Sequence, residues 1–288
     1  MIRRTLTGII LAALLAPAAM AQTVDEVIAK NIEAKGGMEK LKAMKTLRVT
    51  GKMMMGQGME APFTMMAKRP RMTRTEFVFA GMTGVQAYDG KNGWMVMPFM
   101  GKKDPEAMPE DQAKLMEEQA DIDGPLVDWK EKGHKVELLG KEQVEGADAY
   151  KVKVTKKNGD VSTIFIDAES HLEIKSEGKR KIRGTEYEGE TVLGEYKEVE
   201  GMMMAHSMES GAKGSPQRQK MVIEKIEVNP ALADTLFLMP AGTKPASMPA
   251  AADSGKGGAA KAAADSGKAG AGKAAADTVA AGAKAKKK

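Results

Sequence analysis

The side chains that could carry out catalysis in this sequence are few. It has no cysteine, which excludes thiolate chemistry, disulfide frameworks, cysteine-based metal sites and a lipid-modified cysteine. Its three histidines, His134, His171 and His206, lie on separate predicted strands, without partners at metal-ligand spacing. The sequence contains no G-x-S-x-G or H-E-x-x-H motif and no phosphate-binding glycine loop. We therefore expect no catalytic residue, no cofactor and no metal ion, and a protein that is not an enzyme.

Methionine is the unusual residue type, with 24 copies in 288 residues against six phenylalanines. Most methionines fall on predicted strands, and their flexible, polarisable thioethers suit a surface that repacks around varied apolar ligands. Two other interpretations stay open: methionine replaces leucine in an ordinary core, or the sulfurs bind Cu(I). Because runs such as 53–55 alternate between the two faces of a strand, we expect the sulfurs to be scattered rather than gathered around an ion.

The net charge of +5 averages over unlike parts of the chain. Residues 1–21 carry +2 and residues 241–288 carry +6, which leaves −3 on residues 22–240. Aromatic residues make up only 4% of the chain, too few for the stacking platforms of single-strand binders. The basic character belongs to the C-terminal tail, and we expect no nucleic-acid partner.

The first 21 residues have the pattern of a secretory signal peptide. Arg3 and Arg4 precede an apolar run over 8–16, and 19–21 (AMA) form an A-x-A cleavage signal. The apolar run is too short for a membrane span, which needs about 20 residues. We expect cleavage after Ala21 and delivery to the periplasm.

The last 48 residues, 241–288, form a low-complexity tail in which 27 are Ala or Gly. A twelve-residue repeat begins at Ala250, Ala262 and Ala274. Such a segment buries too little apolar surface to offset its chain entropy, so we expect disorder. Its lysines could hold the protein to anionic lipid headgroups or to peptidoglycan, although a solubilising extension without a specific partner fits the composition equally well.

Between these ends, the sequence predicts two or three helices and about a dozen strands. Thr23 and Glu26 form a capping box before a helix, Gly36-Gly37 end it, and a second short helix follows from Met38. Pro109 begins another helix. Period-two patterns predict strands over 46–55, 60–68, 72–79, 84–88, 93–97, 134–139, 149–155, 161–166, 171–177, 190–199, 202–208 and 220–228.

This element order favours an α+β protein and argues against a Rossmann fold or a parallel barrel, because strands and helices do not alternate. Most strands follow one another directly, as in antiparallel sheets. Lys151, Val152, Lys153 and Val154 alternate charged and apolar side chains, as a sheet with one buried face requires. We expect a large curved antiparallel sheet with helices covering its concave face, over residues 22–240.

Several short motifs resemble the periplasmic outer-membrane lipoprotein carriers of the LolA type. They are Lys68-Arg69-Pro70, then residues 89–94 (DGKNGW), and then Pro98-Phe99. Further stretches, at 123–126, 140–152, 167–168 and 229–240, are similar to the wider group of lipoprotein-sorting proteins.

The resemblance implies an incomplete β-barrel whose helices close over an apolar cavity for the acyl chains of lipoproteins or of another lipid. It also implies that Arg69 helps to hold this lid closed. Because an envelope-stress sensor shares the fold, a sensor or scaffold that binds a protein partner and is tethered by the tail stays open. The side chains that we expect at the lid and cavity are Arg69, Met53, Met55, Met65, Phe77, Trp94, Met97 and Phe99.

Overall fold

The computed structural model describes residues 22–55, 58–182 and 185–240. The predicted signal peptide over 1–21 and the predicted tail over 241–288 lie outside the described residues. The described part belongs to one compact unit of the chain.

Two helices open this unit, as the sequence predicts. Helix α1, Val24–Ala34, begins at the Thr23 capping box: the Thr23 hydroxyl accepts from the Glu26 N–H, and the Glu26 carboxylate accepts from the Thr23 N–H at 2.8 Å. The chain then passes through Gly36 and Gly37, whose φ angles of 116° and 90° exclude a continued helix. Helix α2, Met38–Ala43, follows directly.

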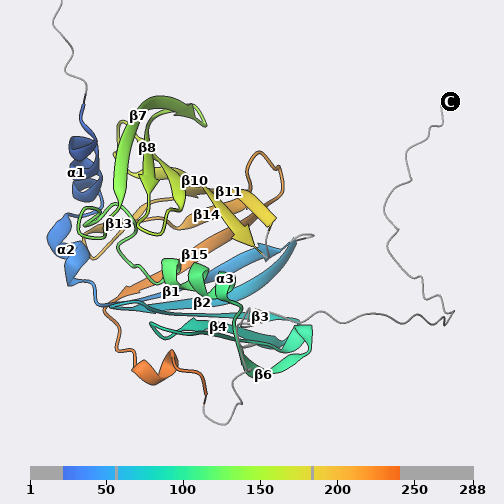
Figure 1. Cartoon of the computed structure of the whole chain (residues 1–288). Helices are drawn as coiled ribbons and strands as arrows, with labels where there is room; N and C mark the ends of the chain where they lie inside the picture. The colour runs from blue at the N-terminus through green and yellow to red at the C-terminus, as the bar shows by residue number, and fades with distance from the viewer. Residues whose placement is uncertain (1–21, 56–57, 183–184, 241–288) are drawn as a thin grey trace, which may run out of the picture. The chain divides into compact units, whose positions relative to one another are not determined.

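The core of the fold is one antiparallel sheet of thirteen strands, in the order β6-β5-β4-β3-β2-β1-β15-β14-β11-β10-β9-β8-β7. The sheet is curved but not closed, because β6 and β7 are its two edges (Figure 1). A separate hairpin pairs β12, Lys197–Val199, with β13, Met202–Met204. The thirteen strands are β1 Thr46–Met55, β2 Met59–Lys68, β3 Met72–Phe79, β4 Met82–Tyr88, β5 Gly93–Met97, β6 Lys102–Ala107, β7 Lys135–Val144, β8 Ala147–Thr155, β9 Val161–Asp167, β10 Glu173–Ile182, β11 Thr185–Gly194, β14 Ser207–Ala212 and β15 Arg218–Val228.

The two edge strands follow one another in the chain, so their connection must run from one edge of the sheet to the other. Helix α3, Glu110–Gln119, and the segment 120–134 make this connection. Helix α3 contacts β3, β4 and β5 on one side and β10 on the other, and it lies within the curve of the sheet in Figure 1. The connection therefore crosses the inner, concave face.

The inner face is apolar where the helices cover it. Val27 and Ile28 of α1 pack on Val152 and Ile164 in the β7–β9 half of the sheet. Met116 of α3 packs on the β4–β5 half, in a cluster that includes Tyr88, Met95 and Met97. Burial of apolar side chains at about 25 cal/mol per Å² makes these two layers the main source of stability.

The outer face is covered on one half by the C-terminal segment. After β15, the chain passes through a short 3-10 helix, η3 Asp234–Leu236, and inserts Leu232 and Phe237 against Met66. Phe237 is fully buried. On the other half, the outer face carries a charged network in which Glu190 pairs with Lys175 and Arg218.

The predicted fold class is confirmed: the structure is a large, open antiparallel sheet with few helices, two of which cover its concave face. The sequence prediction did not include β6, because Pro105 interrupts its pattern. Proline removes a ladder hydrogen bond and is tolerated on an edge strand, which is where β6 lies. The predicted strand over 190–199 is divided, since β11 ends at Gly194 and β12 begins at Lys197.

Candidate functional site

Arg69 lies in the turn between β2 and β3, before a cis peptide bond to Pro70. Its guanidinium donates to both carboxylate oxygens of Asp123, at 2.6 and 2.5 Å. Nε donates to the carbonyl of Met44 at 2.7 Å, and Nη2 donates to the carbonyl of Leu41 at 3.1 Å. The hydrogen bonds to Asp123 raise the pKa of Arg69 above its ordinary value. One side chain thus joins the sheet to the end of α2 and to the segment after α3.

The segment that crosses the concave face is held by further ion pairs. Near the end of α3, Glu117 pairs with Arg71 at 3.0 Å and Glu118 pairs with Lys156 at 2.8 Å. Asp128 pairs with Lys42 of α2 at 3.0 Å. The Arg69–Asp123 pair is the more buried, because the Asp123 side chain is 8% exposed whereas those of Arg71 and Glu117 are more than 40% exposed. We call α3 together with residues 120–134 the lid.

The middle of the inner face lies between the two helix-covered halves. Here Val49, Phe63 and Ile223 are buried and carry a ring of half-buried side chains. A lining of this kind is apolar and partly open, as a surface for an apolar ligand requires. The half-buried side chains of this cluster are Leu47, Met53, Met65, Phe77, Met208, Met221 and Ile226.

The structure brings several of the predicted site residues together on this inner face. Met53, Met65 and Phe77 share the central cluster. Phe77 also contacts the neighbouring α3 cluster, which contains Met97 and Phe99. The rings of Phe77 and Phe99 are 5.6 Å apart, centroid to centroid. These five side chains therefore form one continuous surface under and beside the lid.

Trp94 is a correction to the predicted site. It precedes Met95 on β5, so its side chain points to the outer face. There its indole N–H donates to the carbonyl of Phe237 at 2.8 Å, and the guanidinium of Arg74 lies 5.4 Å from the ring centroid. Trp94 is a core residue under the C-terminal segment. Met55 is the last residue of β1, and its side chain lies outside the described part of the structure.

The sequence analysis missed three residues of this surface and lid. Asp123 appeared only within a family-like stretch, because its partner Arg69 lies 54 residues away and no local pattern links the two. Met208 and Met221 were known as strand methionines, but their common face depends on the pairing of β14 with β15. Strand order, which the sequence does not display, decides these contacts.

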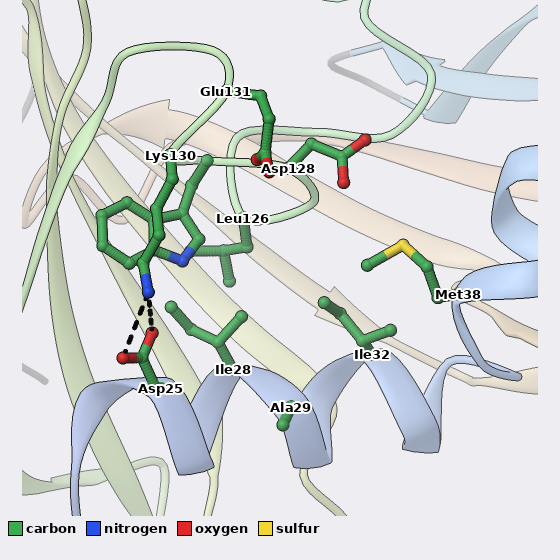
Figure 2. A pocket seen from close by; sticks show the side chains of 10 residues that line it. Asp25, Ile28, Ala29, Ile32, Met38, Leu126, Asp128, Lys130 and Glu131 are labelled. Atoms are coloured by element: carbon green, nitrogen blue, oxygen red, sulfur yellow. Dashed lines mark hydrogen bonds and ion pairs between the residues drawn. The ribbon is translucent and has the colours of Figure 1, made fainter.

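Beside the lid, a surface hollow of about 210 Å³ separates α1 from residues 126–131. Figure 2 shows Ile28 and Ile32 of α1 facing Leu126 across it, with an ion pair of 3.2 Å between Lys130 and Asp25 at one side. Both partners of that ion pair are about 60% exposed, so it holds the helix weakly. Leu126 is buried and ties the lid to the α1 cluster.

Two further searches concern membrane spans and metal ligands. Among the described residues, no helix is long and apolar enough to cross a membrane. Within the same ranges, no group of three His, Cys, Asp or Glu side chains could hold a metal ion.

Comparison with solved structures identifies the fold. The chain superposes on a LolA superfamily protein from Nitrosomonas europaea with a TM-score of 0.52, covering 76% of this chain and 98% of that one at 13% identity. The fold is LolA-like. A DUF1329 family protein from Desulfovibrio piger gives a TM-score of 0.53 over the same shares, at 12% identity. No protein-family model matches the sequence, and no curated protein matches it.

In the LolA-like fold of this chain, the Lys68-Arg69-Pro70 turn lies at the end of β2. The residues from 89 to 92 form the turn between β4 and β5, where the Asp89 carboxylate accepts from the Lys91 and Asn92 N–H groups. Both motifs on which the sequence resemblance rests are therefore turns that set the β2–β3 and β4–β5 hairpins. Arg69 alone among them reaches the lid.

Proposed function

We propose that this protein is a non-catalytic carrier that binds the acyl chains of lipoproteins, or of another lipid, on the inner face of its sheet. We place it in the periplasm after removal of residues 1–21. The observation that carries the proposal is the half-buried methionine and phenylalanine surface, which lies under a lid held to the sheet by Arg69 and Asp123.

An acyl chain on this surface would gain from each methylene that leaves water, at about 0.8 kcal/mol per CH₂. Methionine suits such a ligand because its unbranched side chain adopts several rotamers with little strain. Met53 and Met65 can therefore move to follow chains of different length. Phe63 and Val49 beneath them are buried and provide a fixed floor.

The lid must open to admit and release a chain, and the Arg69 contacts set the energy of opening. When the lid and α2 move away from the sheet, four hydrogen bonds to Arg69 are lost together. Hydrogen bonds to charged groups each contribute about 1.5–3 kcal/mol, less where water replaces the partner. A closed lid without ligand and an open lid with ligand are thus separated by a modest energy that acyl binding can offset.

Adjacent methionines on β1 provide a matched test with a fluorescent fatty-acid probe. Met53 points to the inner face and lies opposite Met221, whereas Met54 points to the outer face and lies opposite Lys220. Met53→Glu would place a charge on the acyl surface and should weaken probe binding at least tenfold. Met54→Glu adds the same charge beside a lysine and should leave the affinity unchanged. Equal affinities of both variants and the unchanged protein would contradict an inner-face site.

A further inference from the structure

Three methionines stand in one row across the inner face. In the register of the sheet, Met53 of β1 lies directly opposite Met221 of β15, and Met221 lies directly opposite Met208 of β14. Directly opposite residues of antiparallel strands have Cβ atoms about 4.5–5.5 Å apart, on the same face. The expectation that strand alternation scatters the sulfurs is therefore incorrect at this row: neighbouring strands supply one thioether each at the same level.

The side chains of this row are turned toward one another rather than away along their strands. The amide Nε2 of Gln219 lies 3.7 Å from Sδ of Met53. Gln219 precedes Met221 by two residues on β15 and shares its face. The Met53 sulfur therefore reaches across to β15, beside Met221. Met53, Met208 and Met221 are all half-buried and pack on the same cluster.

The same-face neighbours of the row are uncharged. Leu193 lies opposite Met208 on β11, Ser210 follows it on β14, and Ile223 follows Met221 on β15. These neighbours give the row neither the carboxylates that would attract Ca²⁺ or Mg²⁺ nor an amine that would repel a cation. What the row presents is a set of neutral, soft sulfur ligands in a partly desolvated setting.

We propose that Met53, Met208 and Met221 form a binding site for a soft monovalent cation, Cu(I). Thioether sulfur prefers Cu(I) over the hard cations, and three thioethers provide a complete trigonal set of ligands. The flexible methionine side chain lets three sulfurs on adjacent strands converge on one ion by rotamer changes alone. This activity goes beyond acyl binding, although it uses part of the same inner face.

The test is an anaerobic titration of the full chain with Cu(I), against a chromophoric Cu(I) chelator. The unchanged protein should take up one equivalent, and the triple variant Met53→Leu, Met208→Leu, Met221→Leu should take up none. Two single variants serve as controls: Met54→Leu lies on the outer face of β1, and Met65→Leu lies in the same cluster but opposite Val49, away from the row. Both should keep one equivalent.

A second readout is Ag(I) titration followed by NMR of ¹³C-methyl methionine, in which three methyl signals should shift together and should be those missing from the triple variant. Because leucine keeps the apolar volume, the triple variant should still bind the fatty-acid probe, so the copper proposal can fail without the carrier proposal and the reverse. Met221→Leu alone, at the centre of the row, covers the case in which the triple variant unfolds. Uptake retained by Met221→Leu, uptake lost equally in Met65→Leu, or no uptake by the unchanged chain would overturn the proposal.

Discussion

The guanidinium of Arg69 is used at four acceptors, which only a planar, multidentate donor can reach at once. Two acceptors are the oxygens of Asp123, and two are the carbonyls of Leu41 and Met44 at the end of α2. Lysine has one nitrogen and cannot reproduce this fork. The residue therefore works as a joint between three parts of the chain.

Arg69→Lys should loosen the lid while keeping the charge. We expect a loss of about 1–3 kcal/mol in unfolding free energy and faster amide hydrogen exchange over residues 120–127. Arg71→Lys is the matched control, because its ion pair with Glu117 is exposed on both sides and such pairs contribute about 0–1 kcal/mol. If the two variants exchange alike over 120–127, Arg69 does not hold the lid.

Glu190 makes the acid stability of the outer face testable. Burial alone would raise the pKa of Glu190, but hydrogen bonds from Lys175 and Arg218 lower it overall. Since its pKa is lower in the folded than in the unfolded protein, Glu190 stabilises the fold above the ordinary value of about 4.5. That stabilisation is lost as the pH falls through the lowered pKa.

The unfolding free energy of Glu190→Gln should therefore differ most from that of the unchanged protein at pH 6, and the difference should shrink toward pH 3. Urea unfolding at several pH values measures it. Glu188→Gln is the control, because its partner Lys179 is 62% exposed at the surface and water screens the pair. A difference for Glu190→Gln that is constant with pH would show that its hydrogen bonds do not depend on the charge.

Among the elements, the segment after β15 acts as a clamp on the outer face of β2–β5. It buries Phe237, accepts the Trp94 indole N–H at the Phe237 carbonyl, and accepts from Lys68 at the Leu232 carbonyl at 2.7 Å. The two strands that carry the Phe63 and Phe77 side chains of the inner face thus have a packed layer behind them. A rigid back layer leaves the adaptable methionines on the other face as the movable part.

Phe237→Ala should remove about 3–5 kcal/mol of unfolding free energy, because it leaves a cavity in a fully buried position. It should also change the fluorescence of Trp94, which contacts this residue. Leu238→Ala is the adjacent control, since Leu238 is 47% exposed. Equal melting temperatures of the two variants would contradict the role of the segment as a clamp.

Local patterns were sufficient to predict most elements, because their signals lie within a few residues. The Thr23 capping box, the Gly36-Gly37 break and the period-two strands all depend on neighbours in the chain. Strand order and facing were beyond reach: β1 lies beside β15, which is more than 160 residues away. Trp94 was misplaced for this reason, since periodicity shows that its two faces differ but not which face the C-terminal segment covers.

For the whole molecule, the open sheet and the chain path explain why binding rather than catalysis is the natural use of this fold. The connection from β6 to β7 crosses the concave face, so the lid is a continuous part of the chain with both ends anchored at sheet edges. The inner surface below it consists of apolar and small uncharged side chains. Acyl chains match that surface, and the lid can move without breaking the sheet.

The acyl surface belongs to residues 22–240, and the basic tail should not contribute to it. Deleting residues 241–288 should leave the affinity for the fatty-acid probe unchanged. Because the deletion removes a charge of +6, binding to vesicles that contain anionic phosphatidylglycerol should fall, most clearly at low salt. Sedimentation with such vesicles measures this, and unchanged sedimentation would show that the tail is no membrane tether.

The most direct test of the carrier account is mass spectrometry of the full chain isolated from its own periplasm under native conditions. The account predicts a bound lipid with acyl chains in the unchanged protein and in Met54→Glu, and its loss in Met53→Glu. Consistently empty protein that also takes up no acyl probe would contradict the account.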